Sequence, residues 1–157
     1  MYAPQPSEPY TPSSGSHLAV FLANGSGTRA SSPRPGEFSD GRYESMSAFW
    51  FDAFSAFFGC DNTGPDPCTL VFTAYTWDQN VGDEIKTYSQ NATVAPCPNS
   101  SGCQLQEVAF PTSFRGLSGL QVQAYVHNEE RMFFMDDVSA GWSNNTCAAG
   151  LTRQRYP

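Results

Sequence analysis

The chain has 157 residues, which is enough for one domain of ordinary size. Only 15% of its residues are charged and its formal net charge is −7, with Lys86 as the only lysine. This composition argues against nucleic acid and anionic membrane surfaces as partners, because both are bound through clustered Lys and Arg. No stretch of about 18 apolar residues is present, so we expect no membrane insertion.

The amino-terminal part of the sequence alternates between Pro- and Ser-rich stretches and short apolar runs. Residues 1–16 contain four prolines and little that could be buried, which predicts a disordered tail or linker ahead of a single domain over residues 17–157. A strand is expected at 17–23, followed by a long loop rich in Gly, Ser and Pro. The apolar run at 46–58 fits a helical stripe or a buried strand, and its aromatic density favours the strand.

Alternation of apolar and polar side chains dominates the rest of the sequence. Residues 69–78 alternate cleanly, and residues 120–128 are the clearest half-buried strand. A turn at 128–130 is expected between that strand and the last one. Further short strands are expected at 87–95, 105–110 and 132–139. Short strands at near-regular spacing, separated by Gly, Pro and Asn, predict an all-β fold, a β-sandwich of two antiparallel sheets.

Cysteines and glycosylation sequons indicate an oxidising, secretory origin. The spacing predicts two short-loop disulfides, Cys60 with Cys68 and Cys97 with Cys103, although other pairings remain open. Cys147 is left over, either as a buried thiol or as a link to a partner outside the chain. N-x-[ST] sequons begin at Asn24, Asn91, Asn99 and Asn144. Met1 is not followed by a basic and then an apolar stretch, so we expect a mature chain or a domain of a longer precursor.

Common catalytic signatures are absent from the sequence, including G-x-S-x-G, H-E-x-x-H and the P-loop. Paired carboxylates could hydrolyse a polysaccharide, and Asp52 inside the aromatic run is the most suggestive candidate. The alternative is an ordinary hydrogen-bonded aspartate. His127, beside acidic residues at a strand end, is more typical of a surface histidine flanking a turn.

Adjacent acids in an apolar strand, Asp136 and Asp137, place one carboxylate on each face of the sheet. An inward acid needs a partner, since an unpaired buried charge costs several kcal/mol. Ca²⁺, a basic side chain such as Arg115, or backbone N–H groups would each serve. Glu37 and Asp40 are candidate co-ligands if a metal is bound.

A polar stripe along residues 120–128 has the composition that sugar recognition needs. Amide groups can hydrogen-bond ring hydroxyls in pairs, and aromatic faces stack on the apolar faces of a pyranose. The alternative is the solvated side of a sheet. The candidate ligand-binding residues are Gln121, Gln123, Tyr125 and His127, with Tyr75 and Trp77 as a second outward group. Trp50 and Trp142 are expected in the core.

Several motifs, taken in order, resemble known extracellular domains. Phe-Phe-Met-Asp-Asp-Val-Ser at 133–139 resembles the closing strand of galactose-binding-like jelly rolls, the fold of many carbohydrate-binding modules. Phe57-Phe58-Gly59-Cys60, Cys68-Thr69-Leu70 with Tyr75, and Ser113-Phe114-Arg115-Gly116-Leu117 are similar to an uncharacterised fungal extracellular domain family. The similarity covers residues 17–155. In that family the domain lies at the carboxyl end of Ser/Thr-rich secreted or wall-associated proteins.

The resemblance implies a jelly-roll β-sandwich, extracellular or cell-wall placement, and glycan binding or adhesion without settled catalytic residues. It also implies a structural Ca²⁺ near the first and last strands, with Asp137 as a ligand. We therefore expect a non-catalytic module that binds a glycan or cell-wall polysaccharide. The alternatives are a polysaccharide-active enzyme that uses Asp52, and a structural or interaction domain of a surface protein linked through Cys147.

Overall fold

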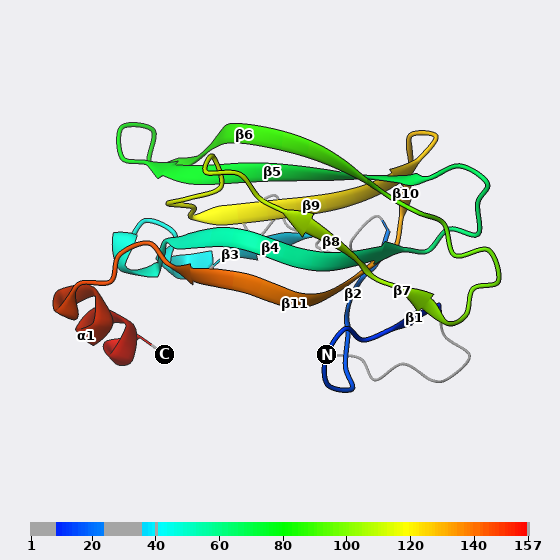
Figure 1. Ribbon diagram of the computed structural model, residues 1–157. Helices are drawn as coiled ribbons and strands as arrows, with labels where there is room; N and C mark the ends of the chain where they lie inside the picture. Colours follow the sequence, from blue (N-terminus) through cyan, green and yellow to red (C-terminus); the bar gives the residue numbers. More distant parts are fainter. Residues whose placement is uncertain (1–8, 24–35, 40, 157) are drawn as a thin grey trace.

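The computed structural model describes residues 9–23, 36–39 and 41–156, whose two larger β-sheets pack face to face (Figure 1). One sheet has the order β10 (Glu129–Arg131), β9 (Gly119–Val126), β5 (Cys68–Asp78) and β6 (Asp83–Val94), with β3 (Glu37–Ser39) also paired to β9. The other has the order β2 (Ala19–Phe21), β11 (Phe133–Trp142), β4 (Phe51–Cys60) and β8 (Gln106–Ala109). Neighbouring strands in both are antiparallel. The predicted all-β sandwich of antiparallel sheets is confirmed.

The alternation predicted for β5 and β9 sets the two faces of the five-stranded sheet. Phe72 pairs with Val122 on the face that packs against the other sheet, and both are almost completely buried. Gln123 lies on the opposite face. β9 and β10 are joined by His127 and Asn128, whose φ angles of 50° and 68° are those of a type I′ hairpin turn. The turn therefore comes earlier than expected, and Glu129–Arg131 form a strand.

The aromatic run expected at 46–58 divides into two elements. Ser47–Phe49 form a single turn of 3₁₀ helix, η2, and β4 begins at Phe51. The strand interpretation is correct for β4 and wrong for η2. β11 runs antiparallel to β4, from the pair Phe133–Cys60 at one end to the pair Trp142–Phe51 at the other.

Aromatic rings fill much of the space between the sheets. Phe58, Phe72 and Phe114 are each at most 1% exposed. The Phe58 ring contacts that of Phe72 edge-on, with centroids 5.1 Å apart, and Phe72 meets Phe110 at the same distance. Such edge-to-face pairs suit the quadrupoles of the rings. Much of the core is therefore built from phenylalanine.

The amino-terminal segment packs on the outer face of the four-stranded sheet. Residues 9–16, expected in a disordered tail, include strand β1 (Tyr10–Thr11), which pairs with β7 (Cys103–Gln104). Tyr10 is 2% exposed, and its hydroxyl donates to the Cys60 carbonyl at 3.0 Å. A Cβ at Gly59 would lie 2.6 Å from the Tyr10 ring, so only glycine admits the ring here. The folded domain therefore begins ahead of residue 17.

A short helix that the sequence did not predict, α1 (Cys147–Arg155), lies at the end of the sandwich where η1 (Gly41–Tyr43) and η2 also lie (Figure 1). Thr146 caps it by accepting a hydrogen bond from the Ala149 N–H at 3.3 Å. Ala149 packs against Ala48 and Phe49. Among the described residues no helix has the length and apolarity needed to cross a membrane.

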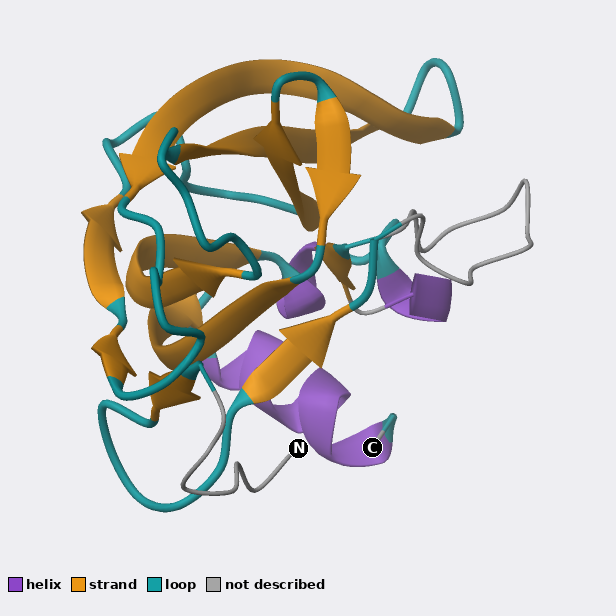
Figure 2. Cartoon of the chain, turned by 90° about the vertical axis from the view of Figure 1, so that its right-hand side faces the viewer, coloured by secondary structure: helices purple, strands orange, loops and turns teal. Residues whose placement is uncertain are grey.

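One side of the sandwich is incompletely closed. β2 pairs only with Phe133–Met135, so in the described residues the second half of β11 has no strand on that side. On the facing sheet, β3 and β10 cover only the two ends of β9. Figure 2 views the sandwich along its strands, from the end opposite α1.

Candidate functional site

A cavity of about 530 Å³ lies between the two sheets, near η2 and α1. Among the described residues that line it, Ser39 and the indole N–H of Trp142 are the only polar side-chain groups. The others are Phe38, Phe49, Phe51, Ala53, Ala56, Phe58, Phe110, Leu120, Val122, Met135, Val138, Ala140 and Gly141. Both sheets contribute to the wall, so the cavity belongs to the sandwich itself rather than to a surface loop.

Small side chains on the four-stranded sheet explain why the cavity is open. Sheets in a sandwich pack about 10 Å apart, and interdigitating side chains normally fill the gap. Here Ala53 pairs directly with Ala140, and Ala56 lies farther along β4. Leu120 and Val122 on the facing sheet cannot fill the volume that three alanines leave.

The rim of the cavity exposes apolar side chains. Val138 and Trp142 both line the cavity, yet they are 51% and 44% exposed, since no described strand pairs with this half of β11 on the side of β2. The expectation that Trp142 belongs to the core is therefore wrong. Trp50 is half-buried and donates its indole N–H to the Glu44 carbonyl at 2.8 Å.

Helix α1 holds one side of this rim. The Arg153 guanidinium lies over the Trp142 ring, 4.8 Å from its centroid. The Nη1 of the same guanidinium donates to the carbonyls of Ala48 and Asn144. Trp142 in turn contacts the Phe49 ring edge-on at 6.4 Å. The helix, η2 and the end of β11 thus form one connected mouth.

The expected polar stripe lies on the outer face of the five-stranded sheet, but its polar groups are engaged within the protein. Gln121 is only 9% exposed, and its side-chain oxygen accepts from the Tyr75 hydroxyl at 3.2 Å. The Gln123 amide and the Tyr125 hydroxyl both donate to Glu130 Oε1, at 3.1 and 3.4 Å. Burial, and then repulsion from the Glu130 carboxylate, raise the pKa of Tyr125.

The other two expected ligand residues lie away from the centre of the stripe. Trp77 is half-buried and pairs with Glu84 on the neighbouring strand β6. His127 lies in the hairpin turn, where its Nε2 is 2.9 Å from an oxygen of Asp66. The structure therefore places Tyr75, Gln121, Gln123 and Tyr125 on one face and separates His127 from them.

His127 instead lines a polar cavity of about 380 Å³ beside the Cys60–Cys68 loop. The Asn62 amide, whose N–H donates to the Asp66 carbonyl at 2.7 Å, helps to shape that loop. The charged and polar side chains of the lining are those of Asp61, Asn62, Thr63, Asp66, His127 and Arg131. This cavity offers hydrogen-bond donors and acceptors to a polar ligand.

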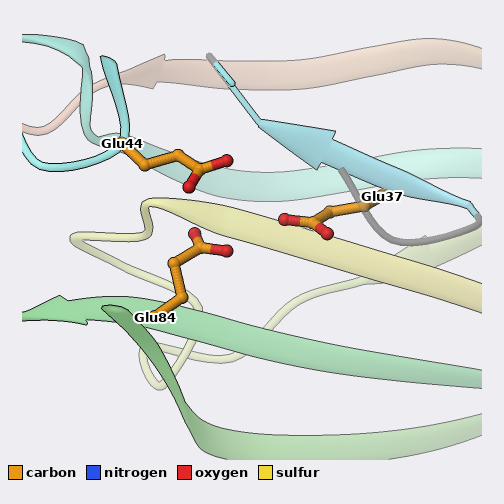
Figure 3. Close-up of side chains that lie close together, drawn as sticks. All are labelled: Glu37, Glu44 and Glu84. Carbon is orange, nitrogen blue, oxygen red and sulfur yellow. The ribbon is translucent and has the colours of Figure 1, made fainter. Parts of the chain in front are cut away.

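Three carboxylates converge beside β9 (Figure 3). Glu37, Glu44 and Glu84 each place one oxygen within 4.8 Å of the others. A Cβ at Gly119 would lie 2.6 Å from Glu37 Oε1 and 2.8 Å from Glu84 Oε1, so glycine lets the carboxylates approach the strand. Ser118 donates to Glu84 Oε1 at 2.6 Å. Oxygen donors of this kind suit a hard cation such as Ca²⁺.

The structure engages the predicted metal ligands Asp136 and Asp137 elsewhere. Asp136 Oδ2 accepts from the backbone N–H groups of Ser13 and Ser14, at 2.7 and 3.1 Å, and Asp137 accepts from the Ser14 hydroxyl. Asp136 therefore has the backbone N–H partners that the sequence left open as one alternative, whereas Asp137 is bonded to a side-chain hydroxyl. Of the expected metal set, Glu37 does lie in an acidic cluster, while Asp40 is outside the described residues.

Asp52 has the hydrogen bonds of a structural aspartate. Its Oδ1 accepts from the Gly116 N–H at 2.8 Å and from the Ser143 hydroxyl. These contacts tie β4 to the loop ahead of β9 and to the end of β11. Nothing in this arrangement singles the residue out as an acid or a nucleophile.

Both predicted disulfides are present. Cys60 bonds to Cys68, Cys97 bonds to Cys103, and Cys147 is a free, exposed thiol rather than a buried one. Three of the sequon asparagines can be located. Asn91 and Asn99 are exposed and Asn144 is half-buried, while Asn24 is outside the described residues.

Sequence reasoning missed the apolar cavity and the Glu44–Glu84 part of the acidic cluster. The sequence holds a weak indication of the cavity, because Ala53, Ala56 and Ala140 occupy inward positions where a sandwich core usually carries larger residues. The sequence holds no indication of the acidic cluster, because its three glutamates come from separate parts of the chain: β3, the loop after η1, and β6.

These features define a disulfide-bonded antiparallel β-sandwich with an apolar cavity between its sheets. Residues 1–153 match the family described as "Domain of unknown function (DUF7371)", and the chain belongs to that family. The predicted membership of an uncharacterised domain family is thereby confirmed. Neither a curated protein nor a solved structure matches the chain.

Proposed function

We propose that this domain is a non-catalytic binding module that holds an apolar small molecule between its sheets. The observation that carries the proposal is the cavity of about 530 Å³, whose described lining is almost entirely apolar. Small-molecule sites typically have volumes of roughly 300–1,000 Å³ and mostly apolar walls. An apolar ligand would gain about 25 cal/mol for each Å² removed from water.

The rim supports this assignment. Exposed Val138 and Trp142 lie where a ligand would enter, and a soluble domain seldom leaves inward-facing apolar residues uncovered without a use for them. A ligand in the cavity would cover both side chains and complete the core.

Binding of N-phenyl-1-naphthylamine, a neutral dye that fluoresces in apolar surroundings, tests the proposal. We expect saturable binding of one dye per chain, lost in Ala140→Phe, which fills the mouth. The matched control is Ala109→Phe, because Ala109 is also an exposed strand alanine but does not line the cavity. Equal binding by both variants, or no saturable binding by the wild type, would refute the proposal.

Glycan binding, expected from the sequence, is a second candidate function. The polar cavity at the Cys60–Cys68 loop favours it, because His127, Asp66 and Asn62 can hydrogen-bond sugar hydroxyls. Half-buried Tyr125 and Trp77 on the outer face offer rings for stacking.

A glycan array followed by titration tests this second candidate. We expect Asp66→Ala to weaken binding if the polar cavity is used, and Tyr125→Ala or Trp77→Ala if the outer face is used. Tyr156→Ala is the control, since Tyr156 is exposed beside α1. No ligand on a broad array, or unchanged affinity in all three variants, would eliminate glycan binding.

The cellular setting of the domain and the finer type of its fold are proposals that follow from the sequence. We propose a jelly-roll sandwich of the galactose-binding type, secreted or attached to a fungal cell wall and glycosylated at exposed Asn91 and Asn99. Two disulfides support an oxidising compartment. Mass spectrometry of the native secreted protein would detect the glycans, and would also detect any link through Cys147.

A structural Ca²⁺ remains a proposal, now placed at the acidic cluster rather than at Asp137. Glu37, Glu44 and Glu84 would hold the ion and so join β3, the loop after η1, and β6. Ca²⁺ takes six to eight oxygen ligands, so further oxygens would have to complete the site.

A further inference from the structure

We propose that the ligand of the apolar cavity is an anionic single-chain amphiphile, with its chain between the sheets and its head beside α1. This inference rests on the proposed apolar-ligand function and specifies the ligand class. A methylene group needs about 30 Å³, roughly the share of one water molecule in the liquid. The cavity of about 530 Å³ thus accommodates a chain of a dozen or more carbons.

The chemistry of the lining requires the polar end of such a ligand to stay at the mouth. Apart from Trp142 at the mouth, Ser39 is the only described lining residue with a polar side chain, and its hydroxyl already donates to Glu44 Oε1 at 3.2 Å. A charged head placed deeper would lose its hydration without gaining partners, which costs several kcal/mol. At the mouth, between Trp142 and Phe49, the head can remain in contact with water.

Two guanidinium groups lie over aromatic rings at or next to this mouth. Arg153 stacks on Trp142 at 4.8 Å. Arg42 lies 4.7 Å from the centroid of the Tyr43 ring, which stacks on Phe49 at 4.8 Å. Each cation is therefore next to a ring that lines the cavity or touches one that does.

Arg153 is suited to bind the head of the ligand. Its contacts with the described residues run through Nη1 and the flat face of the group. Guanidinium carries five N–H donors, so Nε and Nη2 are left for a carboxylate or sulfate. α1 carries no acid, and Arg153 and Arg155 lie in its last turn.

Acids near this mouth are engaged within the protein: Asp52, opposite Gly141, accepts from the Gly116 N–H and the Ser143 hydroxyl, and Glu44 accepts from Ser39. Glu44 is 7% exposed and lies behind Ser39. The net charge of −7 repels anions at long range, but such repulsion between exposed charges is screened within about 10 Å at ordinary salt. Local contacts at α1 therefore decide which head group is preferred.

Three ligands with the same twelve-carbon chain and different heads test the inference by displacement of N-phenyl-1-naphthylamine. We expect dodecanoate to bind roughly three- to tenfold more tightly than dodecanol, as for a partly exposed ion pair, and dodecylammonium to bind most weakly. Arg153→Gln should abolish the preference for dodecanoate. Arg131→Gln is the control, because Arg131 lies at the opposite end and pairs with Glu129.

The affinity for dodecanol, which has no charge, shows whether a variant still has a folded cavity mouth. If Arg153→Gln binds dodecanol as the wild type does, loss of the dodecanoate preference belongs to the charge and not to a disordered helix. If Arg153→Gln also loses dodecanol, Arg42→Gln replaces it as the test variant. Equal affinity for all three heads in the wild type, or tighter binding of dodecylammonium, would overturn this inference and leave the proposed function standing. Failure of every ligand to bind would overturn the proposed function itself.

Discussion

Filling the cavity from within is the most direct test of its existence. Ala53 is 2% exposed, points between the sheets and lines the cavity. Ala53→Leu adds three carbon atoms, and about 0.8 kcal/mol per buried methylene gives at most about 2.4 kcal/mol of stabilisation. Ordering the leucine side chain opposes this by about 0.5–1 kcal/mol. We therefore expect the free energy of unfolding to rise by about 1–2 kcal/mol.

The same substitution in a packed part of the core is the matched control. Ala74 lies on an inward position of β5, is fully buried, and lines none of the cavities described above. Ala74→Leu must overpack its surroundings, so we expect it to destabilise the fold by about 1–3 kcal/mol. The two variants thus differ in sign although the chemical change is identical.

Urea unfolding and differential scanning calorimetry measure both effects. For a domain of this size, a gain of 1–2 kcal/mol corresponds to a rise in Tm of about 2–8 °C. Ala53→Leu should also lose dye binding, because the new side chain occupies the volume that the ligand needs. If Ala53→Leu is destabilised as much as Ala74→Leu, the space between the sheets is not open and both the cavity and the ligand proposal fail.

Four further outcomes are expected. Tyr10→Phe leaves the Cys60 N–H and carbonyl without their partner, so it should destabilise the fold by about 1–3 kcal/mol. Burial raises the pKa of Tyr10, so the contribution of this residue to folding stability is present below about pH 10 and is lost as the pH rises through its folded-state pKa. Tyr10→Phe should therefore flatten the fall in stability at alkaline pH, measured by urea unfolding at pH 8 and 10.5 in a Cys147→Ser background. An unchanged dependence of stability on pH would contradict this. Millimolar Ca²⁺ should raise the Tm of the wild type and not that of Glu84→Gln, and a Tm indifferent to both Ca²⁺ and chelator would exclude the ion. A thiol reagent should modify one group per native chain, at Cys147, and a second reactive thiol before reduction would disprove one of the disulfides.

The sequence predicted those parts of the fold whose signal is local. β5 and β9 were readable because their alternation extends over many residues, and the two disulfides because each closes a short turn. Segment 9–16 was not readable in this way. Tyr10 is one aromatic residue in a Pro- and Ser-rich stretch, and its partners Gly59 and Cys60 lie about fifty residues away.

The site was less accessible to sequence reasoning than the fold. The outward stripe on β9 followed from alternation alone, but the side chains that occupy its polar groups, such as Glu130, come from pairing with another strand. The cavity depends on which residues face each other across two sheets. Ala53 and Ala140 are 87 residues apart in the sequence, and only the register of β4 with β11 makes them neighbours.

The Cys60–Cys68 disulfide and the mouth of the cavity lie at opposite ends of the sandwich, which explains how the two sheets stay together although a cavity separates them at one end. Cys60 ends β4 in one sheet and Cys68 begins β5 in the other, so their bond joins the two layers at one end. Along the β4–β11 pair, Cys60 is opposite Phe133, whereas the mouth residue Trp142 is opposite Phe51 at the other end. The sheets are therefore fixed covalently where the core is full and held by aromatic contacts and α1 where it is not. For the ligand that we propose, we therefore expect entry at the end of the sandwich that carries α1, without separation of the sheets.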